Sequence, residues 1–112
     1  MGDRVLMQCY SSKTGVFGPV LYCHWDGSDA PQIVKALRDR MAERPGDPDY
    51  SSARLVQIAI GNDASALSFG IWNATALLTE SDSHGDAGCV LIDVSDNHSA
   101  QYFGGYLKAE EV

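Results

Sequence analysis

The chain has 112 residues, of which 45% are hydrophobic and 21% are charged, and its formal net charge at pH 7 is −7. These values are typical of a single globular domain that can form an ordinary hydrophobic core. There is no run of about 18 apolar residues, so the sequence predicts no membrane span, and the N-terminus does not have the pattern of a signal peptide.

The first half of the chain predicts a β-hairpin followed by two helices. Short apolar runs over residues 4–10 and 19–25 have the length of strands, and the polar residues between them are typical of a turn. Apolar residues then recur at helical spacing after Asp29, which we expect to cap a first helix that ends near Arg44. A second helix is predicted for residues 50–60, and the short link between the helices favours an αα-hairpin.

The second half predicts three strands and one polar loop. Alternating apolar residues over 67–71 indicate a strand with one buried face, whereas residues 74–78 fit either a helical turn or a strand extension. Apolar runs over 89–94 and 100–107 indicate two more strands, the last with a bend at two glycines. The order β-β-α-α-β-β-β predicts an α+β domain with two helices on one face of a mostly antiparallel five-stranded sheet.

Charge is unevenly distributed along the chain. No Lys or Arg occurs between Leu55 and Leu107, although this half contains six carboxylates. Direct binding of nucleic acid is disfavoured, because phosphate binding requires clustered Lys and Arg. A protein partner with a basic surface is favoured instead. The acidic loop of residues 80–86 would form the contact, together with neighbouring aromatic residues and with Asp93 or Asp96, if exposed. The residues we expect to bind the partner are Glu80, Asp82, His84, Asp86, Asp96, Trp25 and Asp26.

An alternative function is a metal-binding or hydrolytic module. Asp82, His84 and Asp86 occupy every second position of the loop, a spacing that could direct three ligands at one ion. The loop departs from a calcium-binding pattern, however, because its third position is His and its twelfth is Asp93 rather than Glu. The sequence has no glycine-rich phosphate motif and no nucleophile elbow. We therefore expect a protein that is not an enzyme and holds no cofactor or metal.

The three cysteines predict neither a disulfide framework nor a metal site nor a catalytic residue. Cys9, Cys23 and Cys89 are scattered, which argues against a disulfide framework and against a Cys-x-x-Cys zinc site. Cys23 and His24 are adjacent, but neighbours in a strand face opposite sides and cannot form a catalytic pair. We expect three reduced and mostly buried thiols.

Six short segments carry a resemblance that covers most of the chain. They are residues 24–27 (HWDG), 33–37 (IVKAL), 53–57 (ARLVQ), 69–72 (FGIW), 85–88 (GDAG) and 90–94 (VLIDV). This pattern resembles a family of small uncharacterised proteins of phages and prophages. The family has no established activity, so no residue takes a role from it.

The resemblance implies a small, acidic accessory phage protein in the cytoplasm of the host cell. Such a protein would bind and block a host defence complex that handles nucleic acid, as an anti-CRISPR protein does. The second alternative is a structural or self-associating phage protein, for which a homodimer is an option.

Overall fold

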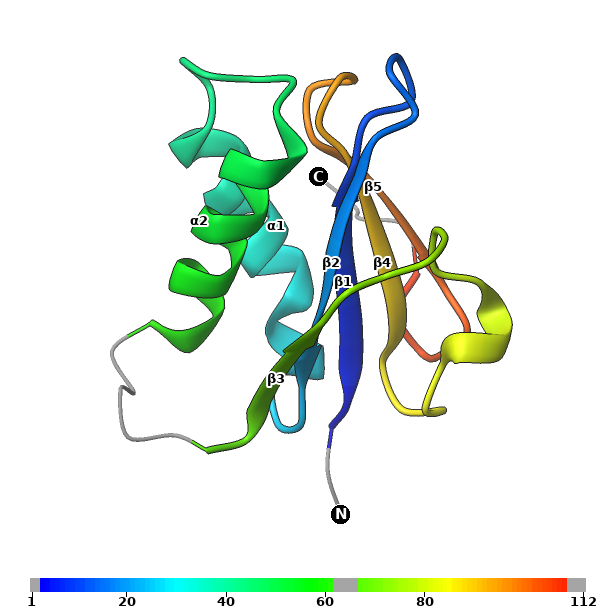
Figure 1. Ribbon diagram of the computed structural model, residues 1–112. Helices are drawn as coiled ribbons and strands as arrows, with labels where there is room; N and C mark the ends of the chain where they lie inside the picture. Colours follow the sequence, from blue (N-terminus) through cyan, green and yellow to red (C-terminus); the bar gives the residue numbers. More distant parts are fainter. Residues whose placement is uncertain (1–2, 62–66, 109–112) are drawn as a thin grey trace.

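The computed structural model describes residues 3–61 and 67–108, and its elements follow the predicted order (Figure 1). The predicted α+β class is confirmed. The turn expected at Asn62 and Asp63 lies outside the described residues. The elements are β1 (Val5–Tyr10), β2 (Phe17–Cys23), the 3₁₀ helix η1 (Gly27–Asp29), α1 (Ala30–Arg40), α2 (Pro48–Ile60), β3 (Phe69–Trp72), the 3₁₀ helix η2 (Glu80–Asp82), β4 (Gly88–Asp93) and β5 (Ser99–Phe103).

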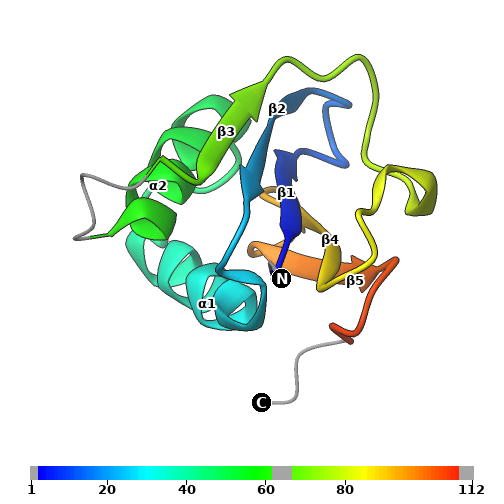
Figure 2. The same cartoon turned by 90° about the horizontal axis from the view of Figure 1, so that it is seen from below.

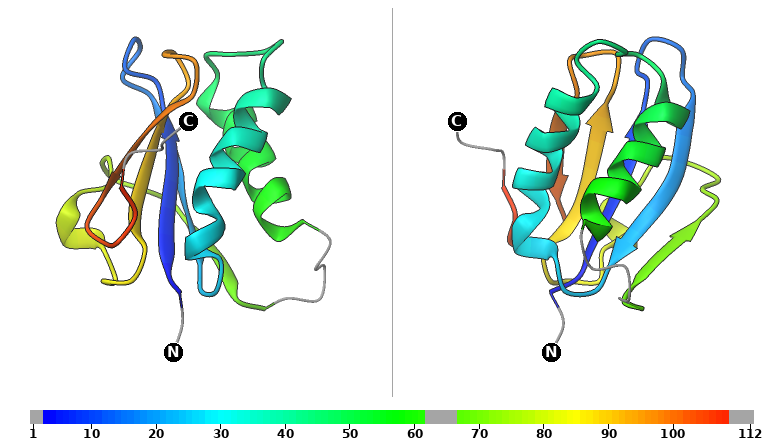
Figure 3. Two further views of the ribbon diagram at one scale, coloured as in Figure 1. Left: turned by 180° about the vertical axis from the view of Figure 1, so that it is seen from behind. Right: turned by 90° about the vertical axis from the view of Figure 1, so that its left-hand side faces the viewer.

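The five strands form one sheet in the order β3-β2-β1-β4-β5. The pair β1–β4 is parallel and the other three pairs are antiparallel, which confirms the mostly antiparallel sheet and the β1–β2 hairpin. Helices α1 and α2 lie side by side on one face, and the segment between β3 and β4 crosses the other (Figures 2 and 3). Because of these directions, β1 and β4 begin at the end of the sheet where β2 and β5 finish.

Both faces of the two central strands, β1 and β4, are buried, which explains why their sequences are mostly apolar and do not alternate with polar residues. On the helix side, Met7 and Ile92 pack with Leu37 of α1 and Leu55 of α2. On the opposite side, a smaller apolar cluster forms under the crossing segment and includes Leu78. The other buried members of this smaller cluster are Leu6, Val20, Cys89 and Leu91.

The boundaries of α1 differ from those predicted. Asp29 does not cap the helix, because its backbone is itself helical and its side chain makes no capping hydrogen bond. It is instead the last residue of η1, which continues directly into α1: the Ala30 amide donates to the Gly27 carbonyl. The helix also ends at Arg40, before the predicted end at Arg44, and residues 41–43 form a turn.

Helix α2 begins at Pro48, slightly before its predicted start at residue 50, and Asp47 caps it. The carboxylate of Asp47 accepts hydrogen bonds from the amides of Asp49 at 3.0 Å and Tyr50 at 3.3 Å. These bonds satisfy two amides of the first turn that have no partner inside the helix. Three strands differ from their predicted ranges by two residues or more: β2 spans Phe17–Cys23, β3 spans Phe69–Trp72, and β5 ends at Phe103, where Gly104 takes a φ of 78°. The buried face predicted for the third strand is wrong, because Ile71 is 56% exposed on this edge strand.

A buried histidine connects the β4–β5 turn to α2. His98 is 2% exposed, and its Nε2 lies 2.9 Å from the hydroxyl of Ser51. Its backbone has a φ of 55°, and its carbonyl accepts a hydrogen bond from Arg38 at 3.1 Å. Burial lowers the pKa of His98 below its usual 6.5, and the positive charge of Arg38 acts in the same direction.

This lowered pKa predicts a loss of stability at mildly acidic pH. The unfolded chain binds a proton to His98 near pH 6.5, whereas the folded chain resists protonation until a lower pH. The free energy of unfolding should therefore decrease as pH falls below 6.5, with a slope of at most about 1.4 kcal/mol per pH unit. Urea unfolding of the wild type and of His98→Asn, at several pH values between 7.5 and 5, measures the contribution of His98 to this pH dependence.

Asparagine tolerates the left-handed backbone, and both proteins keep His24 and His84. The difference between the two pH profiles therefore isolates His98. We expect the profile of His98→Asn to be flatter. Parallel profiles would show that His98 does not resist protonation in the folded protein.

Candidate functional site

Carboxylates gather at the end of the sheet where β1 and β4 begin. The strand directions bring the start of the chain, the residues after β2 and the loop before β4 to this end (Figure 1). Only two cationic side chains of the described residues share it, Arg4 and Lys108. We call it the acidic end, and its six carboxylates are those of Asp3, Asp26, Asp29, Glu80, Asp82 and Asp86.

A row of aromatic rings lies at the acidic end on the face opposite the helices. Tyr22 of β2 is at its centre and stacks on Trp72 of β3, with centroids 6.3 Å apart and planes at 28°. The Tyr22 hydroxyl lies 2.7 Å from Nδ1 of His24, whose ring contacts Trp25 edge-on at 4.5 Å. We call Trp72, Tyr22, His24 and Trp25 the aromatic row. His84 from the loop before β4 adds a ring edge-on to Tyr22 at 5.4 Å.

Both tryptophans of the row are exposed, Trp25 by 56% and Trp72 by 45%. Their neighbours nevertheless hold them in place. Trp72 lies diagonally across from Tyr22 on the adjacent strand, where side chains of one face meet. Each ring of the row thus contacts its neighbour, and two of the rings stand on paired strands, so contacts with the row require little additional ordering.

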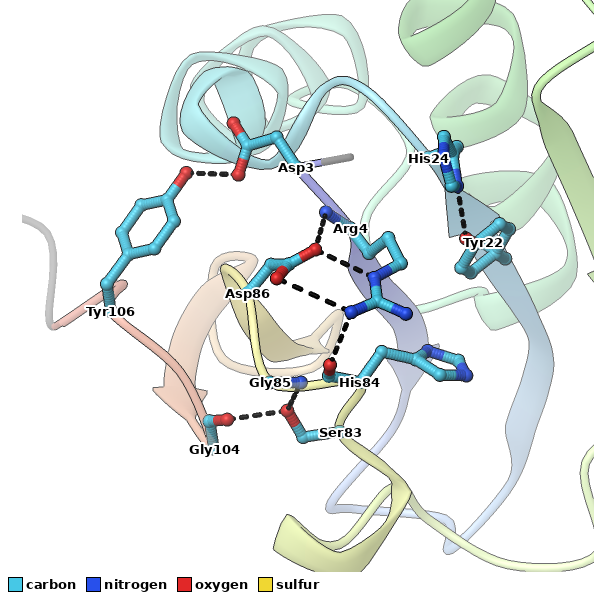
Figure 4. A network of polar contacts seen from close by, with 10 residues as sticks. All are labelled: Asp3, Arg4, Tyr22, His24, Ser83, His84, Gly85, Asp86, Gly104 and Tyr106. Carbon is cyan, nitrogen blue, oxygen red and sulfur yellow. Dashed lines mark hydrogen bonds and ion pairs between the residues drawn. The ribbon is translucent and has the colours of Figure 1, made fainter. Parts of the chain in front are cut away.

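Arg4 fixes the loop that carries His84 (Figure 4). Its Nε donates to Asp86 Oδ2 at 2.7 Å, its backbone amide donates to the same oxygen at 3.1 Å, and its Nη2 donates to the His84 carbonyl at 2.9 Å. The hydrogen bonds from Arg4 lower the pKa of Asp86. The charge of Asp86 is thus compensated within the molecule, and its function here is to position the loop.

The structure brings most of the predicted partner-binding residues to the acidic end. Glu80 and Asp82 are exposed in η2, where Asp82 Oδ2 accepts hydrogen bonds from the amide and hydroxyl of Thr79 at 2.7 and 3.1 Å. His84 and Trp25 are exposed beside the row.

The remaining predicted residues are placed differently. Asp26 is half-buried next to Trp25. Asp96 is exposed in the β4–β5 turn at the opposite end of the sheet, separated from the loop before β4 by the whole of that strand (Figure 1). Asp93 is buried and accepts hydrogen bonds from Ser12 and Ser95, so it is not part of any exposed surface.

The geometry does not support the alternative of a metal centre. Asp86 is bound to Arg4 and the His84 ring packs on Tyr22 (Figure 4). Asp82 is bound to Thr79, so the three side chains do not converge on one point. Across residues 3–61 and 67–108, no three His, Cys, Asp or Glu side chains are arranged to hold a metal ion.

The cysteines are buried and unpaired, which confirms their expected burial. Burial raises the pKa of Cys9 and Cys23 to about 12 and that of Cys89 to about 11, so all three are thiols at neutral pH. Cys23 belongs to the helix-side core, whereas His24 contacts Tyr22 on the opposite face. They form no catalytic pair, as the strand alternation predicts.

Some residues of the site are absent from the predicted set. They are Arg4, Tyr22, His24, Trp72 and the carboxylates Asp3 and Asp29. Strand alternation places Tyr22 and His24 on one face, but it does not reveal that Trp72 lies on the neighbouring strand. Arg4 and Asp86 are 82 positions apart and meet only because β1 and β4 run in parallel.

Comparison of the chain with protein-family models, with curated proteins and with solved structures finds no match. The resemblance to phage proteins therefore stays a prediction. Among the residues that the structure describes, no helix has the length and apolar character needed to cross a membrane.

Proposed function

We propose that the chain is a non-enzymatic phage protein that binds a host defence complex in the cytoplasm and blocks it, as an anti-CRISPR protein does. The observation that carries this proposal is the position of the aromatic row within the acidic end. Such a surface suits a basic partner, and nucleic-acid-handling complexes have basic surfaces because they bind phosphates. The carboxylates would occupy the places that phosphates take.

The charge of the molecule is polarised in a way that orients it toward such a partner. The middle of the chain, residues 30–54, is close to neutral, because its cationic side chains on the helices and after α1 are nearly balanced by carboxylates. The acidic end, in contrast, carries a clear excess of carboxylates. A protein with one acidic surface is drawn to a basic site with that surface leading, which raises the association rate. The cationic residues in question are Lys35, Arg38, Arg40, Arg44 and Arg54.

The aromatic row supplies what charge alone does not. Exposed ion pairs contribute little affinity each, whereas buried Trp and Tyr side chains dominate many interfaces. Trp25 and Trp72 are both exposed and would be covered by a partner. The carboxylates would therefore orient the protein and speed its association, and the aromatic row would slow dissociation of the complex.

A plaque assay tests the proposed function. The chain is expressed in a panel of bacterial strains, each of which carries one CRISPR type that targets an infecting phage. We expect plaque formation to be restored in at least one strain. Glu80→Gln/Asp82→Asn should restore it less, because two exposed charges of the acidic end are lost.

The matched control is Asp39→Asn/Glu43→Gln, which removes the same charge from α1 and the turn after it. This control should restore plaques as the wild type does. Failure of the expressed and folded wild type to restore plaques in every strain of the panel would refute the proposed function.

A further inference from the structure

A pocket opens beside the aromatic row, between β2, β3 and the segment that crosses the sheet. Its volume is about 260 Å³. Leu6, Val20 and Leu78 supply apolar lining, and Trp72, Asp82 and His84 supply an aromatic ring, a carboxylate and an imidazole.

A fully buried glutamine builds this pocket. Gln8 of β1 donates from Nε2 to the carbonyls of Gly18 at 3.0 Å and Ala76 at 3.3 Å, and its Oε1 accepts from the Leu78 amide at 2.9 Å. Residues 73–79 are neither helix nor strand, in contrast to both alternatives that the sequence allowed. Gln8 and the buried Leu78 side chain hold this irregular segment across the sheet. The pocket is therefore a fixed part of the fold.

We propose that this pocket receives an arginine side chain from the partner's basic surface, an inference that rests on the proposed function. The apolar lining suits the aliphatic stem of arginine, the Trp72 ring suits stacking or cation–π contact, and the Asp82 carboxylate suits the guanidinium charge. None of the described residues that line the pocket is Lys or Arg, so no cation there balances the charge of Asp82, although its Oδ2 accepts hydrogen bonds from Thr79.

Size and chemistry favour one side chain of a protein over other occupants. The volume is below the range of about 300–1,000 Å³ that is usual for small-molecule sites. An anionic ligand would be repelled by Asp82 and the other carboxylates of the acidic end. Arginine is preferred over lysine because its planar, weakly hydrated guanidinium both stacks on a ring and binds a carboxylate through two hydrogen bonds.

The two tryptophans allow a direct measurement. In Trp25→Phe, Trp72 is the only tryptophan of the chain, so its fluorescence reports on the pocket. Hexa-arginine, hexa-lysine and hexa-glutamate peptides are titrated into this protein at low salt. We expect a saturable change with hexa-arginine, binding at least about threefold weaker for hexa-lysine, and no change with hexa-glutamate.

Adding Asp82→Asn should weaken hexa-arginine binding about tenfold, whereas adding Glu43→Gln should change it less than twofold. Asparagine keeps an oxygen that can accept from Thr79, which preserves the cap of η2. Amide chemical shifts of residues 73–78 in the wild-type protein provide a second readout. The inference would be overturned if Asp82→Asn and Glu43→Gln had equal effects, or if hexa-arginine and hexa-lysine bound equally well. It would also be overturned if hexa-arginine changed neither the Trp72 fluorescence nor the amide shifts.

The titration tests the arginine pocket and the plaque assay tests the proposed function, so a negative result in one does not decide the other. A protein that restores plaques but does not respond to hexa-arginine refutes the pocket alone. A protein that binds hexa-arginine through Asp82 but restores no plaques refutes the proposed function alone.

Discussion

Gly88→Ala should destabilise the protein by about 4 kcal/mol, a large part of the roughly 5–15 kcal/mol that holds a domain of this kind folded. Gly88 begins β4 with a φ of 100°, a conformation that residues with a side chain rarely adopt. An added Cβ would collide with the Phe103 carbonyl oxygen and lie 2.6 Å from the Gly105 amide nitrogen. These are backbone atoms and cannot move aside as a flexible side chain would.

Urea unfolding compares this variant with Gly15→Ala, which is the matched control. Gly15 also has a positive φ, of 77°, but a Cβ there would meet nothing within 4 Å. This control should lower the free energy of unfolding by only about 1–2 kcal/mol, because alanine is disfavoured in the left-handed backbone conformation. Equal losses for the two variants would show that the β4–β5 contact at Gly88 is looser than described.

Gln8→Leu should lower the free energy of unfolding by about 3 kcal/mol, although leucine has a similar size. Gln8 is 0% exposed, so water cannot replace the hydrogen bonds that are lost. The substitution leaves the Leu78 amide and the carbonyls of Gly18 and Ala76 without this partner in a buried region. The crossing segment should loosen, and with it the pocket beside Trp72. Denaturant unfolding measures the loss, and Trp72 fluorescence in the Trp25→Phe background measures the local change.

The control is Gln101→Leu, the same substitution at an exposed position of β5 in the same sheet. It should change the free energy of unfolding by less than about 0.5 kcal/mol. If Gln8→Leu were as mild as Gln101→Leu, the hydrogen bonds of Gln8 would not be what holds residues 73–79.

The sequence was sufficient for the order of elements because each has a local signal. The helical spacing of apolar residues over 50–60 is an example, and helix α2 confirms it. Local signals also mislead: Asp29 sits before Pro31 much as Asp47 sits before Pro48, yet it makes no capping bond. The difference arises because the backbone of Asp29 is already helical, and because Pro31, two residues later, has no amide N–H to donate to a cap.

The candidate site was predictable only in part, for a physical reason. Single acidic or aromatic residues in polar segments stand out in the sequence, which is why Glu80, Asp82, His84 and Trp25 are among the predicted residues. Their grouping depends on which strands pair and in which direction. Local patterns do not encode that the parallel pairing of β1 and β4 neutralises Asp86 with Arg4, or that Asp96 lies at the other end of the sheet.

The central claim is that the acidic end binds a basic, nucleic-acid-binding surface. Its most direct test is competition with target DNA for the purified CRISPR effector complex of a strain in which plaques are restored. We expect the wild-type protein to displace DNA with an affinity that falls as salt rises. Glu80→Gln/Asp82→Asn should be about tenfold weaker, and Asp39→Asn/Glu43→Gln within twofold of the wild type. Equal displacement by both double variants would contradict the claim.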